Sequence, residues 1–491
     1  MAAAAGVGVT WLVASRSEVT AAGTFFATVA AFTLVAGVAR LGAPTSLVYW
    51  PARLRAEGQH GLLGPCLRIG LVPVAVASVA LGGLLLLAAD PIAAVFADHD
   101  GRPATADALR ALAPLLPAAV LTEALLATAR GYRAVRPTIM LDRLLRPGLQ
   151  LLAVGAVVGL WWAAGGPAPW VLALAWAVPY LPVAVLAGRQ LRRVHTSAIA
   201  NPTAPPPDQT QTARLRRRFW RFAGPRAVAS VLQLALQRVD VLLVAALGGL
   251  AAAAGYAVAS RFLAVGQLAN QGISQAVQPR LAEALATGDT DRARDLFQTA
   301  TGWLVLLAWP LHLSVLVAAP AYLGLFGDAY RDGAPAVMTL AAAMLLATVC
   351  GPVDMVLAMG GRTRWNLINV SAALAVMVLI SLLLIPRLGA LGAAVGLAAA
   401  VAVNNLAPLA QVRRAVRVHP FGAGTRAAAA LAAGCFGVVP LASVALGGGA
   451  LAGLAVGGLG YGAGVWMFRR QLAWRELTTL GRRPTITRGR S

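Results

Sequence analysis

About fourteen apolar stretches, each near the length of a membrane-spanning helix, constrain this chain more than any other feature of its sequence. A helix needs roughly 20 apolar residues to cross a bilayer. Hydrophobic residues make up 59% of the chain and charged residues 12%, about half of what a soluble domain carries. The sequence therefore predicts an all-α integral membrane protein. The stretches lie near 1–15, 22–48, 62–88, 106–129, 137–163, 169–190, 220–246, 250–278, 299–323, 334–359, 365–386, 389–411, 425–446 and 448–468.

The chain repeats itself at a shift of about 230 residues. Residues with the same identity at this shift include Phe32/Phe262, Val35/Val265, Ala39/Ala269, Gly42/Gly272 and Gly58/Gly288. A second corner, Gly131-Tyr132-Arg133, aligns with Gly360-Gly361-Arg362 at a shift of 229. Two homologous membrane halves are the usual build of an alternating-access transporter, with the substrate site between them. A duplicated structural bundle that transports nothing is the alternative.

The repeat and the stretches predict two pseudo-symmetric six-helix bundles followed by a helical hairpin. We expect an N-terminal bundle over 1–193, whose first helix looks truncated, and a C-terminal bundle over 219–420. A cytoplasmic linker over 194–218 joins them; its Pro/Thr/Gln composition is typical of disorder. The hairpin covers 421–470 and a cytoplasmic tail covers 471–491.

The basic residues are distributed very unevenly between alternate loops. All 41 are Arg; 33 fall in one set of alternate loops and ends, five in the other set and three inside the stretches. This is the positive-inside bias, and it predicts a multi-pass protein of the cell membrane with both termini and the 191–221 loop in the cytoplasm. The net charge of +23 thus favours anionic lipid headgroups as partners and not nucleic acid. The sequence has no metal-ligand spacing and no GxxxxGK[ST] motif, so we expect no cofactor.

Several motifs resemble those of the actinobacterial polysaccharide-biosynthesis flippases, part of the multidrug/oligosaccharidyl-lipid/polysaccharide exporter superfamily. They are GYAVASRFLAVGQLANQGISQAVQPRLAEALATGD from 255, QTATGWLVLLAWPLHL from 298, DMVLAMGGRTRWNLINV from 354 and, in the first half, ASRSEVTAAGTFF over 14–26. The resemblance covers roughly residues 14–420. It implies a V-shaped pair of bundles, export of a polyprenyl-pyrophosphate-linked glycan, and a polysaccharide polymerase as a candidate protein partner.

Charged residues inside the stretches are the candidate site, because a charge at mid-membrane costs at least ~2.5 kcal/mol and usually faces an aqueous cavity. Arg40, Arg238 and Arg261 are the candidates for binding the pyrophosphate, since the planar guanidinium offers paired donors. Their alternative role is an internal ion pair, such as Arg261 with Asp240. The remaining candidates are polar residues of the cavity or of ion coupling, and each could instead only tie helices together. They are Asp240, Glu123, Asp354, Asn270, Gln271, Asn366 and Asn369.

Two other functions compete with a lipid-linked oligosaccharide flippase. A cation-coupled drug or metabolite antiporter of the same superfamily would need acids to dominate its cavity, but Arg and acids are balanced here. A membrane glycosyltransferase could use the DxD-like Asp98-His99-Asp100 in an external loop. The external loops are too short for such an enzyme, so we do not expect an enzyme.

Overall fold

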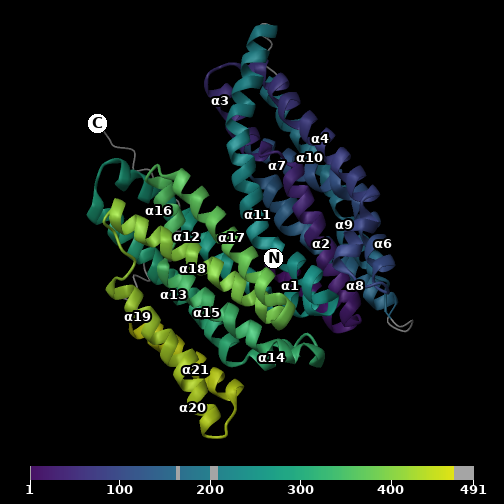
Figure 1. The fold of residues 1–491 in the computed structure, drawn as a ribbon. Helices are drawn as coiled ribbons and strands as arrows, with labels where there is room; N and C mark the ends of the chain where they lie inside the picture. Colours follow the sequence, from purple (N-terminus) through teal and green to yellow (C-terminus); the bar gives the residue numbers. More distant parts are fainter. Residues whose placement is uncertain (1, 162–165, 200–207, 469–491) are drawn as a thin grey trace. The chain divides into compact units, whose positions relative to one another are not determined.

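The computed structural model describes residues 2–161, 166–199 and 208–468 (Figure 1). Within these ranges every regular element is a helix, which confirms the predicted all-α fold class. The predicted cytoplasmic tail, 471–491, lies outside the described residues.

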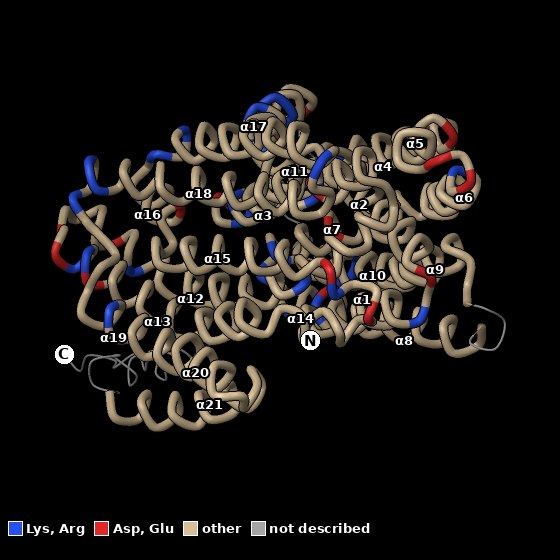
Figure 2. Tube along the Cα trace, turned by 60° about the horizontal axis from the view of Figure 1, so that its bottom comes forward, with Lys and Arg blue, Asp and Glu red and all other residues tan. Residues whose placement is uncertain are grey.

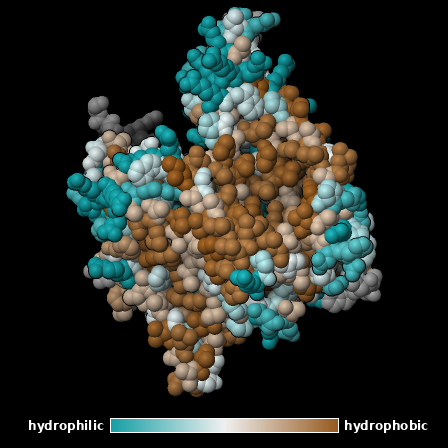
Figure 3. Space-filling view, viewed as in Figure 1, coloured by the Kyte–Doolittle hydropathy of each residue, from teal (hydrophilic) through white to brown (hydrophobic). Residues whose placement is uncertain are grey.

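Twelve segments of the described chain are long and apolar enough to cross a membrane. One of them, Gln209–Ala286, is 78 residues long and covers two of the predicted stretches. The first predicted stretch corresponds to a helix of 15 residues, which is shorter than a typical span. These two facts account for the difference from the predicted fourteen. The visible face in Figure 3 is mostly apolar, as expected of a lipid-facing surface.

The described chain divides into two compact units. Unit 1 comprises Met1–Val258, Leu325–Ala329 and Ser381–Ala393. Its helices up to residue 199 are α1 (Ala2–Arg16), α2 (Val19–Ala39), α3 (Ala43–Ala56), η1 (His60–Leu62), α4 (Leu63–Leu87), α5 (Ala89–Phe96), α6 (Arg102–Leu112), η2 (Ala113–Leu115), α7 (Leu116–Gly131), η3 (Thr138–Leu145), α8 (Arg146–Leu160), α9 (Pro169–Ala177) and α10 (Tyr180–Ile199). The long helix α11 (Gln209–Ala259) follows, with a non-helical residue at Gly249.

Helix α11 packs closely on α2 because glycines remove the side chains between them. A Cβ on Gly23 would lie 1.9 Å from the carbonyl oxygen of Leu250, and one on Gly37 would lie 2.0 Å from the Leu234 side chain. From Gly23 to Gly37 the residue number rises along α2, while the facing residue number on α11 falls from 250 to 234, so the helices are antiparallel.

The boundaries of the two bundles at 193, 219 and 420 remain a prediction.

The predicted disordered linker is helical at both of its ends. Residues 194–199 continue α10 and residues 209–218 form the start of α11, while 200–207 lie outside the described residues. The start of α11 is helical because Leu215 and Phe219 are buried, which gives this Arg-rich segment an apolar face to pack.

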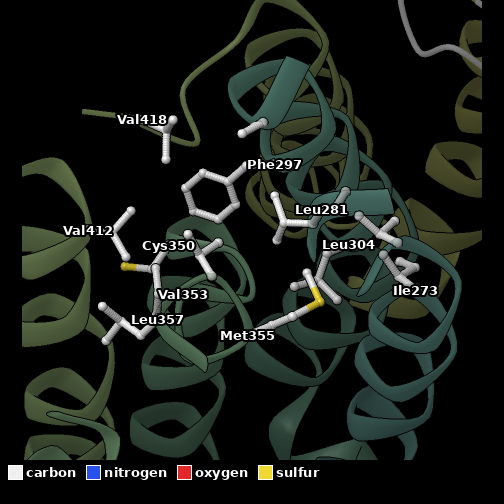
Figure 4. Packing of buried hydrophobic residues seen from close by; sticks show 14 of the residues in the cluster. Ile273, Leu281, Phe297, Leu304, Cys350, Val353, Met355, Leu357, Val412 and Val418 are labelled. Atoms are coloured by element: carbon white, nitrogen blue, oxygen red, sulfur yellow. The ribbon is translucent and has the colours of Figure 1, made fainter. Parts of the chain in front are cut away.

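Unit 2 comprises Ala259–Gly324, Tyr330–Ile380 and Ala394–Ser491. The helices from residue 261 on are α12 (Arg261–Ala286), α13 (Thr290–Val317), α14 (Ala319–Gly324), η5 (Asp328–Gly333), α15 (Ala334–Cys350), α16 (Val353–Met359), α17 (Thr363–Leu388), α18 (Ala390–Ala415), α19 (Ala423–Ala433), η6 (Gly434–Val438), α20 (Val439–Ala445) and α21 (Ala450–Met467). Figure 4 shows its core, where Phe297 of α13 lies among Leu281, Val412 and Val418.

The predicted C-terminal hairpin forms helices that pack against α13. The Tyr461 hydroxyl donates a hydrogen bond to the carbonyl oxygen of Leu306 at 2.6 Å. The Thr425 hydroxyl donates to the carbonyl of Gln298 at 3.2 Å.

Helices α15, α20 and α21 carry no charged residue along their length (Figure 2).

The repeat is visible in the backbone hydrogen bonds. After Gly58 the N–H of Gln59 donates to Leu54, and after Gly288 the N–H of Asp289 donates to Ala284, with both glycines left-handed. The shift is 230 in both donor and acceptor. This is a helix C-terminal cap that needs a residue with positive φ, a role that favours glycine.

The other matched glycine pair, Gly42 and Gly272, does not share a conformation. Gly42 has a φ of 67° and starts α3, whereas Gly272 lies inside the continuous helix α12. The reason is local packing: a Cβ on Gly42 would lie 2.6 Å from the Ala223 carbonyl oxygen, and one on Gly272 would meet nothing within 4 Å. The identity at this position therefore does not predict the same turn.

Candidate functional site

Arg40 and Glu123 form an ion pair within unit 1. Helix α2 ends at Ala39, and the left-handed Leu41 and Gly42 turn the chain directly after Arg40. The Arg40 Nη1 atom lies 2.8 Å from Oε2 of Glu123 on α7, and their side chains are 28% and 42% exposed. The Arg40 Nε atom is buried and has no hydrogen-bond partner among the described residues. The structure thus brings together one predicted phosphate ligand and one predicted coupling acid.

A second ion pair, Arg146 with Asp142, is close enough to this one for Glu123 to act electrostatically on Arg146. Asp142 lies in the π-helical segment η3, and the two charged groups are 3.0 Å apart. The guanidinium also donates to Gln150 at 3.2 Å and lies 5.2 Å from the ring centroid of Tyr180. We call Arg40, Glu123, Asp142, Arg146, Gln150 and Tyr180 the polar cluster.

Sequence analysis missed Asp142 and Arg146. Both lie near the start of the apolar stretch 137–163, where composition does not separate a helix from the adjoining loop. The signal that could have found them is their spacing of four residues, which places opposite charges side by side on a helix.

The Asp240 side chain is buried, and its carboxylate accepts hydrogen bonds from groups of the same helix, α11. Its two carboxylate oxygens accept hydrogen bonds from the Tyr256 hydroxyl and the Val241 N–H, both at 2.8 Å, and the residue is 5% exposed. Asp240 and Tyr256 lie on either side of Gly249, whose φ of 82° and ψ of 171° interrupt α11. The hydrogen bond therefore joins the two helical parts of α11 across the interruption.

Arg238 is partly buried on α11, and its Nε atom has no hydrogen-bond partner within the described part of the chain. Helices α2 and α11 are antiparallel, and Gly37 of α2 faces Leu234 of α11. Arg40 lies three residues after Gly37, and Arg238 lies four residues after Leu234. Because the helices run in opposite directions, the two offsets add to seven residues. With 1.5 Å per residue, the two Arg backbones are about 10 Å apart along the helix axes. Arg261 is the first residue of α12 in unit 2.

The remaining candidates lie in unit 2. The Asn369 and Gln411 amides donate to each other at 2.8 and 2.9 Å, and Asn369 is 4% exposed. The Asn366 amide donates to the backbone carbonyl of Asp354 at 2.9 Å, and the Asp354 side chain stands in the first turn of α16. Asn270 and Gln271 are exposed on α12. Within the described ranges no group of three or more His, Cys, Asp or Glu residues could hold a metal ion.

Comparisons with known proteins agree on the fold. Residues 225–391 match the MatE family model. No curated protein matches the chain in sequence. A structure of the lipid II flippase MurJ in an inward closed conformation superposes with a TM-score of 0.71 at 11% identity, over 96% of this chain and 98% of that one.

Two further structures belong to transporters of the MOP superfamily. An inward-facing multidrug resistance MATE transporter gives a TM-score of 0.66 at 14% identity, over 85% of this chain and 95% of that one. A MOP superfamily transporter from Pyrococcus furiosus, described as having a binding pocket of reversed polarity, gives 0.54 at 15% identity, over 84% of this chain and 91% of that one. The chain therefore has the fold of MOP superfamily transporters.

Proposed function

We propose that this chain is an alternating-access flippase that exports a polyprenyl-pyrophosphate-linked oligosaccharide to the outer leaflet of the cell membrane. The observation that carries the proposal is the polar cluster, which holds two Arg side chains inside segments that are long and apolar enough to cross a membrane. The fold match to a lipid II flippase over nearly the whole chain supports the same class of substrate.

The polar cluster has the chemistry to receive a phosphate group. Arg40 uses one of its five N–H donors on Glu123 at 2.8 Å, and its buried Nε donor is free of any partner in the described chain. A guanidinium can bind two phosphate oxygens at once, and such charge-assisted bonds are roughly twice as strong as neutral ones. In our proposal Glu123 is the counter-ion of Arg40 in the empty site, and the substrate pyrophosphate replaces it.

The need for such a site follows from the substrate. A sugar headgroup carries many hydroxyls, and each unpaired polar group in hydrocarbon costs several kcal/mol. A polar surface between helices lowers this cost while the polyprenyl tail stays in the lipid. Within unit 1, the Tyr180 hydroxyl would supply an uncharged partner for the sugar.

The test is outward movement of a fluorescent polyprenyl-pyrophosphate-sugar in proteoliposomes. We expect Arg40→Gln to slow movement at least tenfold, because a charge-assisted bond of about 1.4 kcal/mol or more is lost. We expect Glu123→Gln to tighten substrate binding, because Arg40 loses its competing partner. Arg110→Gln is the matched control: this Arg is also ion-paired, with Asp90 at 2.6 Å, but it lies in a different ion-pair group.

Normal movement in Arg40→Gln, with the variant present in the membrane at the wild-type level, would overturn the proposal. Export of a cationic drug against a proton or sodium gradient, with no movement of the lipid-linked sugar, would favour the antiporter instead.

A further inference from the structure

A cavity in unit 1 lies at the junction of three segments, and none of its lining residues belongs to the polar cluster. The last turns of α3 contribute Trp50 and Leu54, and the turn Glu57–Leu62 that ends in η1 closes one side. The first turns of α11 contribute the rest of the wall. Its volume is about 360 Å³. This lies at the lower end of the range for small-molecule sites, roughly 300–1,000 Å³.

Two residues that line this cavity, Trp50 and His60, each carry a buried polar atom with no hydrogen-bond partner among the described residues. The Trp50 residue is 7% exposed, and its Nε1 donor makes no hydrogen bond to any described residue. The Nδ1 atom of His60 is buried and equally without a partner in the described chain. A buried donor left unpaired costs about 1–3 kcal/mol, so native proteins rarely keep one without a ligand or a water.

The α11 wall of the cavity is positively charged. Gln211, Arg214, Leu215 and Arg218 line it, and their spacing places them on one face of the helix. Both Arg side chains are exposed, and no ion pair of either is found among the described residues. Glu57 also lines the cavity, but Arg53 pairs with it at 2.6 Å and offsets its charge.

We propose that this cavity binds a phosphate ester, with Arg214 and Arg218 as the cationic ligands and Trp50 Nε1 as a neutral donor. An indole N–H and two guanidinium groups are donors only, so they fit an acceptor-rich anion and not a cation. The apolar surfaces of Trp50, Leu54 and Leu215 fit the carbon part of the same molecule. The phosphate can come from an anionic phospholipid headgroup or from a soluble phosphate compound.

The test measures binding to the purified full chain in detergent. One arm adds phosphatidylglycerol in mixed micelles, with phosphatidylcholine as the reference lipid, and the other adds glycerol 3-phosphate, which is a soluble phosphate ester. We expect Arg214→Gln/Arg218→Gln to weaken binding about tenfold or more. Arg216→Gln/Arg217→Gln is the matched control, because it removes the same charge from the same turns of α11 and neither residue lines the cavity. We expect it to change the affinity less than twofold.

Trp50→Phe separates the site from general charge attraction. It keeps an aromatic ring and all the charges but removes the N–H donor, so we expect weaker binding with unchanged thermal stability. Saturable binding that Arg214→Gln/Arg218→Gln weakens identifies a headgroup if it occurs in the lipid arm alone, and a soluble ligand if it occurs in the glycerol 3-phosphate arm alone. No saturable binding in either arm, or equal losses in the two double variants, overturns the proposal.

Discussion

The sequence predicts Asn369 as a polar residue of the cavity or as a tie between helices, and its surroundings in the structure favour the structural role. Its amide and that of Gln411 form a closed pair of hydrogen bonds between α17 and α18, at 2.8 and 2.9 Å. Each of the two amides therefore donates one hydrogen bond to the other and accepts one from it. A side chain that is 4% exposed also has little surface left for a substrate.

We therefore expect Asn369→Leu to destabilise the protein by about 1–3 kcal/mol, because the Gln411 amide is left unpaired in an apolar region. The double variant Asn369→Leu/Gln411→Leu should recover most of this loss, because no polar group is then left without a partner. Chemical unfolding of the purified variants measures both effects. A substrate contact would give the opposite pattern: unfolding free energies close to wild type, and transport lost in the single and the double variant alike.

The candidate residues show how far sequence reasoning reaches at this scale. It selects Arg40 and Glu123 as candidates, because a charge in an apolar stretch is conspicuous, and the structure pairs them at 2.8 Å. It missed Asp142 and Arg146, since residues near the end of a stretch cannot be separated from the adjoining loop by composition. The partner of Asp240 could not be predicted either, because Tyr256 comes close only through the interruption of α11 at Gly249.

At the scale of helices, close packing in unit 1 depends on glycines that face another backbone. Gly82 and Gly83 are neighbours in α4 and differ in this respect. A Cβ on Gly82 would lie 2.9 Å from the carbonyl oxygen of Ala113, which is backbone and cannot rotate away. A Cβ on Gly83 would meet nothing within 4 Å.

We expect Gly82→Ala to lower the free energy of unfolding by roughly 1–3 kcal/mol, the usual cost of overpacking. Gly83→Ala should leave it unchanged or raise it by up to about 1 kcal/mol, because Ala is the better helix former. Denaturation in mixed micelles compares the two variants directly. If both substitutions had the same effect, the α4–η2 contact would not be as close as the structure places it.

The helices themselves could be predicted from the sequence, because apolar stretches of membrane length have almost no other stable state. The positions at which these helices are interrupted could not be predicted from the sequence. The caps at Gly58 and Gly288 follow the repeat, but the break at Gly42 has no counterpart at Gly272. Backbone conformation at these positions depends on which neighbour lies opposite, and for Gly42 that neighbour is Ala223, about 180 residues further along the chain.

At the scale of the whole molecule, the distribution of Arg suggests the direction in which charge moves. The Arg-rich loops predict a cytoplasmic side, which is the negative side of an energised cell membrane. The proposed substrate carries a pyrophosphate, so its headgroup is an anion of charge about −2. Moving one elementary charge across 100 mV is worth ~2.3 kcal/mol. If no other charge moves with it, such a headgroup would gain roughly twice that free energy on leaving the cytoplasm.

We therefore expect an inside-negative potential by itself to accelerate outward movement of the lipid-linked sugar in proteoliposomes. Valinomycin with a potassium gradient sets the potential, with pH and sodium equal on both sides. Cations that move inward with each cycle would add to the charge displaced, whereas Arg side chains that move outward with the headgroup would cancel part of it. The double variant Glu123→Gln/Asp354→Asn tests the two acids, and in our account it keeps the response to potential. Rates that do not change with the potential but follow a pH or sodium gradient, and that lose this dependence in the double variant, would instead assign ion coupling to one or both of these acids.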